Sequence, residues 1–85
     1  MKKNGKIQFA VCLNNKGYPA SLEVGKLYRV IADEEAAKEN LLRVVDESGD
    51  DYAFASNRFH IVELPQTIKK TLLQASSKIN LTNTI

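Results

Sequence analysis

The sequence has no tryptophan, only one cysteine and only one histidine among its 85 residues, and it has no long apolar run. The single cysteine, Cys12, permits no disulfide within the chain, which is typical of proteins in a reducing compartment. The apolar run near the N-terminus, Phe9–Leu13, is too short for the core of a signal peptide, and no stretch is long and apolar enough to span a membrane. We therefore expect a cytoplasmic protein.

An excess of charge is also missing. Twelve lysines and arginines stand against ten aspartates and glutamates, which gives a net charge of +2 at pH 7. So small a charge supports nucleic-acid binding only if basic side chains gather on one face, against the acidic stretches Asp33–Glu35 and Asp46–Asp51. Nucleic-acid binding thus stays open as an alternative. The lysines that could contribute are Lys2, Lys3, Lys6, Lys16, Lys69, Lys70 and Lys78.

The chain shows no pattern that carries catalytic chemistry. It has no nucleophile–base pair, no glycine-rich phosphate loop and no metal-ligand spacing. His60 alternates outward between Phe59 and Ile61 with no partner in sight, so we expect it on the surface. The acidic stretch Asp33–Asn40 offers too few oxygen ligands at loop spacing for a cation. We expect a protein that is not an enzyme and has neither cofactor nor metal.

Alternating apolar residues predict a mainly β domain. The first strand covers Ile7–Leu13, with its bulky side chains facing the core and Cys12 on the opposite face. Further strands are predicted over Leu27–Ala32, Leu41–Asp46, Tyr52–Phe54 and Phe59–Glu63, with a 3₁₀ turn over Ala55–Arg58. The predicted core is Ile7, Phe9, Val11, Tyr28, Val30, Leu42, Val44, Phe54 and Ile61, and Arg29, Arg43 and His60 are predicted to be exposed.

The connections between these strands differ in kind. Asn14–Leu22, with its glycine and proline, predicts a long irregular loop in which Tyr18 either contacts a partner or folds back on the domain. Asp33–Asn40 is either a helical turn capped by Asp33 or a solvated loop. Glu47–Asp50 predicts a hairpin turn, with Gly49 at a position that suits a positive φ.

After Pro65 the apolar period changes and predicts a helix over residues 65–80. Its apolar stripe is formed by Ile68, Leu72, Ala75 and Ile79. An isolated helix of this length is marginal in water, so the stripe should rest on something. Packing on the chain's own β domain is the favoured arrangement, and a homodimer through the helix is the alternative.

The order of these elements resembles the Src-homology-3 (SH3) family of small barrels. SLEVGKLYRVI resembles the family's diverging turn and second strand, DESGDDYAF its distal hairpin, and Ala55–Phe59 its 3₁₀ signature. The chain is also similar to small bacterial and phage proteins that carry such a barrel alone. The resemblance implies a small five-stranded SH3-like barrel with a C-terminal α-helix. The segments would be a flexible basic N-terminus (1–5), the barrel (6–64), an amphipathic helix (65–80) and a frayed tail (81–85).

The departures from this family bear on function. Polyproline ligands dock in an aromatic groove, but here Ala55 stands for the signature proline, Arg58 for its tyrosine, and the tryptophan is missing. The usual polyproline-binding mode is therefore not expected. If the family's usual side is used, the partner surface includes Leu13, Tyr18 and Arg58. The sequence thus predicts a non-catalytic protein-interaction module, with a protein as its partner.

Overall fold

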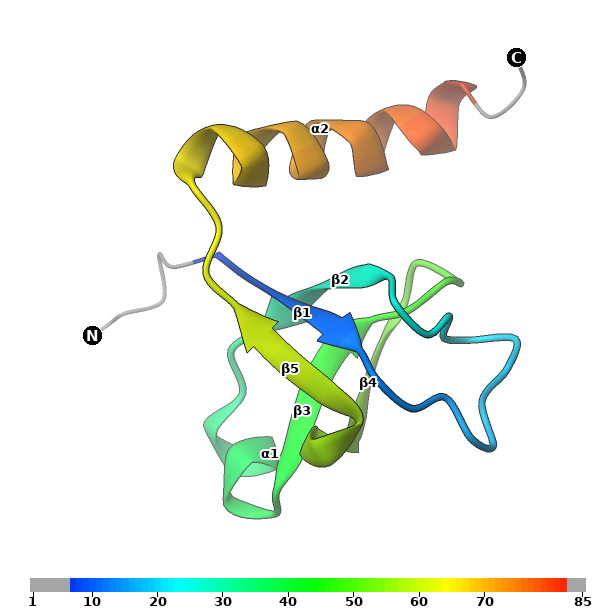
Figure 1. Cartoon of the computed structure of the whole chain (residues 1–85), viewed down its shortest axis with the longest axis vertical. Coiled ribbons are helices and arrows are strands. Elements are labelled where there is room, and N and C mark those ends of the chain that lie inside the picture. The colour runs from blue at the N-terminus through cyan, green and yellow to red at the C-terminus, as the bar shows by residue number, and fades with distance from the viewer. Residues whose placement is uncertain (1–6, 83–85) are drawn as a thin grey trace.

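The computed structural model describes residues 7–82 of the chain, with side chains as far as residue 75 (Figure 1). The predicted flexible segment 1–5 lies outside the described residues, as do residues 83–85 of the predicted frayed tail. The elements are β1 (Gln8–Cys12), β2 (Leu27–Ile31), α1 (Glu34–Lys38), β3 (Leu41–Val45), β4 (Asp51–Ala55), the 3₁₀ turn η1 (Ser56–Arg58), β5 (Phe59–Val62) and α2 (Gln66–Thr82). The five predicted strands, the 3₁₀ turn and the C-terminal helix are all present.

The strands form one antiparallel sheet in the order β4-β3-β2-β1-β5. β1 lies inside the sheet, paired with β2 on one side and with β5 on the other. Different parts of β2 pair with its two neighbours: Leu27–Val30 pairs with β1, and Val30 and Ile31 pair with β3. No ladder joins β4 to β5 within the described part of the chain, so the sheet is open at these two edges.

The sheet is nevertheless strongly curled. In a flat sheet the two edge strands would lie four strand spacings apart, roughly 19 Å. Yet the end of β4 and the start of β5 are joined only by η1, and the four Cα steps from Ala55 to Phe59 reach at most about 14 Å. The chain can make this connection only if the edges bend toward each other. Figure 1 shows the curl of the sheet.

The core corrects the predicted orientation of the first strand. Ala10 and Cys12, not Ile7 and Val11, face the main cluster of buried residues, and Cys12 is only 1% exposed. Phe9 is buried as predicted, but on the other face, where its cross-strand neighbours are Arg29 and Val62. Small side chains on the inner face of a central strand leave room for large rings from its neighbours. The residues of the core cluster are Ala10, Cys12, Leu22, Tyr28, Val30, Val44, Phe54 and Phe59, with Leu42 packed against it.

Two further expectations about burial were wrong. Ile61 is exposed, and Phe59, two residues earlier on the same face of β5, takes the core position instead. Arg43 is half-buried rather than exposed, because two carboxylates hold its guanidinium against the sheet. Arg29 and His60 are exposed as predicted.

The two helices differ in how they contact the rest of the described chain. α1 confirms the helical-turn alternative, with the Asp33 carboxylate accepting a hydrogen bond from the Ala36 N–H (3.0 Å). Among the residues that the structure describes, α2 is not in any of the closely packed pairs of elements, so the favoured packing of this helix on the β domain is not supported and stays a prediction. Of its predicted stripe, Ile68 is exposed, Leu72 and Ala75 are half-buried, and the side chain of Ile79 lies outside the described residues.

Candidate functional site

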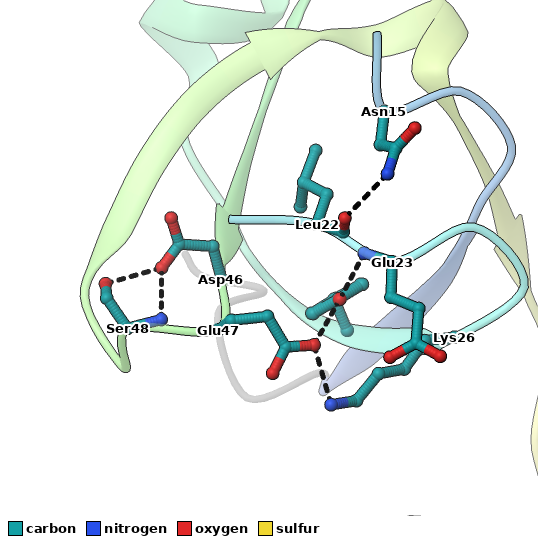
Figure 2. Close-up of polar contacts among 8 residues, drawn as sticks. Asn15, Leu22, Glu23, Lys26, Asp46, Glu47 and Ser48 are labelled. Atoms are coloured by element: carbon teal, nitrogen blue, oxygen red, sulfur yellow. Dashed lines mark hydrogen bonds and ion pairs between the residues drawn. The ribbon is translucent and has the colours of Figure 1, made fainter. Parts of the chain in front are cut away.

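The loop between β1 and β2 leaves the sheet and returns to it at one point. Cys12 N–H donates to the Lys26 carbonyl (2.9 Å), and Gly25 N–H donates to the Cys12 carbonyl (2.8 Å). Within the loop, Gly17 takes a positive φ of 88°, and Tyr18 N–H closes a turn on the Asn15 carbonyl (2.8 Å). Asn15 Nδ2 then donates to the Leu22 carbonyl (2.9 Å; Figure 2). The loop is thus internally bonded and holds Tyr18 in a defined position.

Arg58 of η1 brings the three predicted partner-surface residues together. Its carbonyl accepts hydrogen bonds from the N–H groups of Leu13 (2.7 Å) and Asn14 (3.3 Å). Its Nη1 donates to the Asn14 carbonyl (3.1 Å), and its Cζ lies 4.8 Å from the centroid of the Tyr18 ring. This distance is typical of a cation–π contact. We call Leu13, Tyr18 and Arg58 the loop–η1 surface.

Tyr18 combines the two roles that the sequence left open. Its ring packs edge-on against Phe54 of β4, with centroids 5.1 Å apart and an interplanar angle of 86°. It therefore does fold back on the domain. It is also 42% exposed, and Leu13 is 54% exposed, so both offer apolar surface to solvent. An aromatic ring fixed from one side and open on the other suits a contact residue, since little side-chain entropy remains to be lost on binding.

Tyr18 also lines a hollow in the surface. The cavity measures about 370 Å³. Its lining includes Tyr18 and Ser21 of the loop, Asp46 and Ser48 of the β3–β4 hairpin, and Tyr52 and Phe54 of β4. We call this cavity the hairpin hollow. It shares Tyr18 with the loop–η1 surface, and so the two form one continuous candidate site.

Among the described residues, Asp46 is the one charged residue that lines the hairpin hollow, and it is only 6% exposed. Its Oδ1 accepts hydrogen bonds from the N–H (2.8 Å) and the hydroxyl (2.5 Å) of Ser48. This local bonding is an Asx turn, and it helps to set the hairpin together with the positive φ of 90° at Gly49. Figure 2 shows the second carboxylate oxygen pointing away from Ser48.

A polar cluster, in which only Tyr28 is buried, fastens the loop to the same hairpin (Figure 2). Glu47 Oε2 accepts from Lys26 Nζ (2.6 Å) and from the Tyr28 hydroxyl (2.5 Å), which itself accepts from the Glu23 N–H (2.8 Å). Lys26, followed by Tyr28, holds the pKa of Glu47 below its usual range. Burial and the hydrogen bond to Glu47 raise the pKa of Tyr28. These bonds keep Tyr18 and Ser21 opposite Asp46 and Ser48, because Glu47 N–H also donates to the Ser21 carbonyl (2.9 Å).

Several basic side chains are engaged within the protein. Lys26 pairs with Glu47, Lys38 with Glu35 (3.6 Å), and Arg43 with Asp33 (2.7 Å) and Asp51 (3.1 Å). The Arg43 guanidinium lowers the pKa of Asp33. Of the lysines proposed for nucleic acid, Lys16 and Lys70 are exposed and Lys69 is half-buried. Lys2, Lys3, Lys6 and the side chain of Lys78 lie outside the described residues.

Two further side chains could carry chemistry, those of His60 and Cys12. His60 is exposed on β5, and Cys12 is a free, buried thiol. Among the residues that the structure describes, no group of three or more His, Cys, Asp or Glu side chains could hold a metal ion. Between residues 7 and 82, neither helix is long and apolar enough to cross a membrane.

The sequence predicted the loop–η1 surface but missed the hairpin hollow. Asp46 carried a signal, because an aspartate two residues before a serine and three before a glycine is typical of a turn bonded by its side chain. Tyr52 carried none, since it looks like any other strand aromatic. Comparison with models of protein families, with curated proteins and with solved structures finds no significant match to this chain.

Proposed function

We propose that the chain is a small SH3-like barrel of the bacterial or phage type that acts as a non-catalytic protein-interaction module. The observation that carries the proposal is the convergence of Leu13, Tyr18 and Arg58, three residues up to 45 positions apart in sequence, on one surface where Leu13 and Tyr18 are exposed and Arg58 is half-buried. The strand order, in which the meander β2-β3-β4 is continued on the β2 side by β1 and then β5, supports the barrel assignment. The cytoplasmic location remains part of the proposal and rests on the single cysteine.

The contact mode proposed here differs from polyproline recognition. A polyproline helix needs exposed faces of aromatic rings on which to lie. On this chain, the guanidinium of Arg58 already lies over the Tyr18 ring. What the surface offers is the Leu13 side chain, the remaining face and edge of Tyr18, and the outer N–H groups of Arg58. An arginine beside a tyrosine is typical of the central residues of protein interfaces.

The test is affinity capture of partners from an extract of the cells that produce the protein. Val24 provides a matched control for Leu13, since both side chains are 54% exposed and lie in the same loop region. Leu13→Ser and Arg58→Ala should reduce the captured protein about tenfold or more, as expected for central interface residues. Val24→Ser should leave it unchanged.

Two results would remove the proposal. Equal capture by Leu13→Ser, Val24→Ser and the unaltered protein would show that the loop–η1 surface is not used. Retention of RNA or DNA that survives protease and falls steeply with salt would favour the nucleic-acid alternative instead.

A further inference from the structure

We infer that the hairpin hollow receives one basic side chain, lysine or arginine, from the partner. The inference rests on the proposed function and names the chemistry of the group that this module recognises. Its starting point is the free oxygen of Asp46. No hydrogen bond from the described residues reaches Asp46 Oδ2, whereas Oδ1 has two. No fully buried side-chain oxygen or nitrogen of the described chain lacks a partner, so Oδ2 keeps some access to solvent, and Asp46 is one of the residues that line the hollow.

The charges around the hollow favour a cation. Lys26, which reaches the hairpin, is already paired with Glu47. Arg43 is paired with Asp33 and Asp51. An uncharged apolar ligand would bury the Asp46 carboxylate without compensation, which is unfavourable. A lysine or arginine would give it a charge-assisted hydrogen bond. A metal ion would need several more oxygen ligands than this wall supplies.

The remaining lining suits the stem of such a side chain. Tyr18 and Tyr52 both pack against Phe54, at centroid distances of 5.1 and 6.4 Å from its ring. Methylene groups of a lysine or arginine pack well on rings of this kind, and the cation gains from the same rings when it lies over them. About 370 Å³ is at the lower end of the range for ligand sites, so the hollow has room for one long side chain rather than a folded segment.

The experiment is a titration of the amide NMR spectrum with Nα-acetyl-lysine methylamide, and separately with the norleucine analogue, which has the same stem without the charge. The lysine compound should shift the signals of Tyr18, Ser48 and Tyr52 and saturate in roughly the millimolar range expected for one ion pair with ring contacts. The norleucine compound should bind about tenfold more weakly, the loss expected for one charge-assisted hydrogen bond.

Three variants locate the effect. Asp46→Asn can still accept the bonds from Ser48, and it should weaken lysine binding about tenfold. Asp50→Asn removes the same charge from an exposed position of the same hairpin outside the hollow, and it should change binding less than about twofold. Tyr52→Leu, at an exposed position, should weaken binding about threefold or more without unfolding the domain. It decides the question if Asp46→Asn fails to fold.

Equal losses in Asp46→Asn and Asp50→Asn, or equal binding of the two compounds, would overturn the inference. Its failure is separable from that of the proposed function. If the lysine compound does not bind while partner capture still depends on Leu13 and Arg58, the interaction module stands without a basic-residue site. If the compound binds through Asp46 while capture ignores Leu13, the hollow is a site but the loop–η1 surface is not.

Discussion

Phe54 and Phe59 belong to the two opposite edges of the open sheet, yet their ring centroids lie 6.0 Å apart. This contact links β4 and β5 through the core, although no backbone hydrogen bonds pair these two strands. Phe54 also touches Tyr18 and Tyr52, so the same ring forms part of the core and of the floor of the hairpin hollow. Stability and the candidate site therefore depend on one side chain.

Phe54→Ala should lower the free energy of unfolding by about 3–5 kcal/mol, because it removes a buried ring and leaves a cavity between the sheet edges. Urea denaturation measures the change. Tyr52→Ala is the matched control, since this neighbouring aromatic is exposed and should cost about 1 kcal/mol or less. A loss below about 1 kcal/mol for Phe54→Ala would mean that the edges are not held by this contact.

Cys12 should react slowly with thiol reagents in the native protein, because its thiol lies in the core rather than at the surface. A thiol-specific reagent should label it slowly in buffer and at once in denaturant. Since this is the only cysteine, the signal has one source. Cys12→Ser should cost about 1–3 kcal/mol, as a hydroxyl is buried in an apolar site. Fast labelling of the folded chain would contradict the assigned face of β1.

Stability should fall in acid through Glu47. Its pKa in the folded protein lies below the ordinary 4.5, so its contribution is fully present above pH 4.5 and is lost as the pH falls through the folded value. Thermal unfolding between pH 7 and pH 3 should show the stability gap between the unaltered protein and Glu47→Gln narrowing below pH 4.5. Glu63→Gln, at an exposed position with no ion pair among the described residues, should show no such gap. A gap independent of pH would rule out the ion pair as its cause.

Removal of the residues after Leu64 should leave the domain folded with a melting temperature changed by a few degrees at most. The reason is that α2 is not among the closely packed elements. Sedimentation of both forms decides what the helix does. Loss of concentration-dependent association on truncation would assign α2 to a homodimer. A large drop in melting temperature at every concentration would show instead that it covers the sheet.

The sequence predicted most of the fold because alternation is a local signal. It predicted the strands, η1, the positive φ of Gly49 and, to within one residue, the start of α2. The inward face of β1 was predicted wrongly, because the larger side chains, Phe9 and Val11, were expected in the core. The smaller Ala10 and Cys12 lie there instead, with the rings of Phe54 and Phe59, and this need for small side chains arises only in the curled sheet.

The candidate site was partly predictable for a similar reason. Leu13, Tyr18 and Arg58 were predicted through the family resemblance, and the structure brings them together. The hairpin hollow was not, because it depends on a loop residue, Tyr18, lying opposite a hairpin residue, Asp46, far along the chain. Such a contact is decided by the polar cluster around Glu47, which no local pattern reveals.

The position of β1 inside the sheet sets an order of events during synthesis. β2, β3 and β4 are consecutive and can zip together as soon as they are made. β1 emerges first but needs β5 on its other side, and the Phe9–Val62 pair closes a separation of 53 residues (62 − 9). Contacts between such distant residues form slowly. One edge of β1 therefore stays unpaired until β5 has been synthesised. During that time the nascent chain is most prone to pairing with strands of other chains.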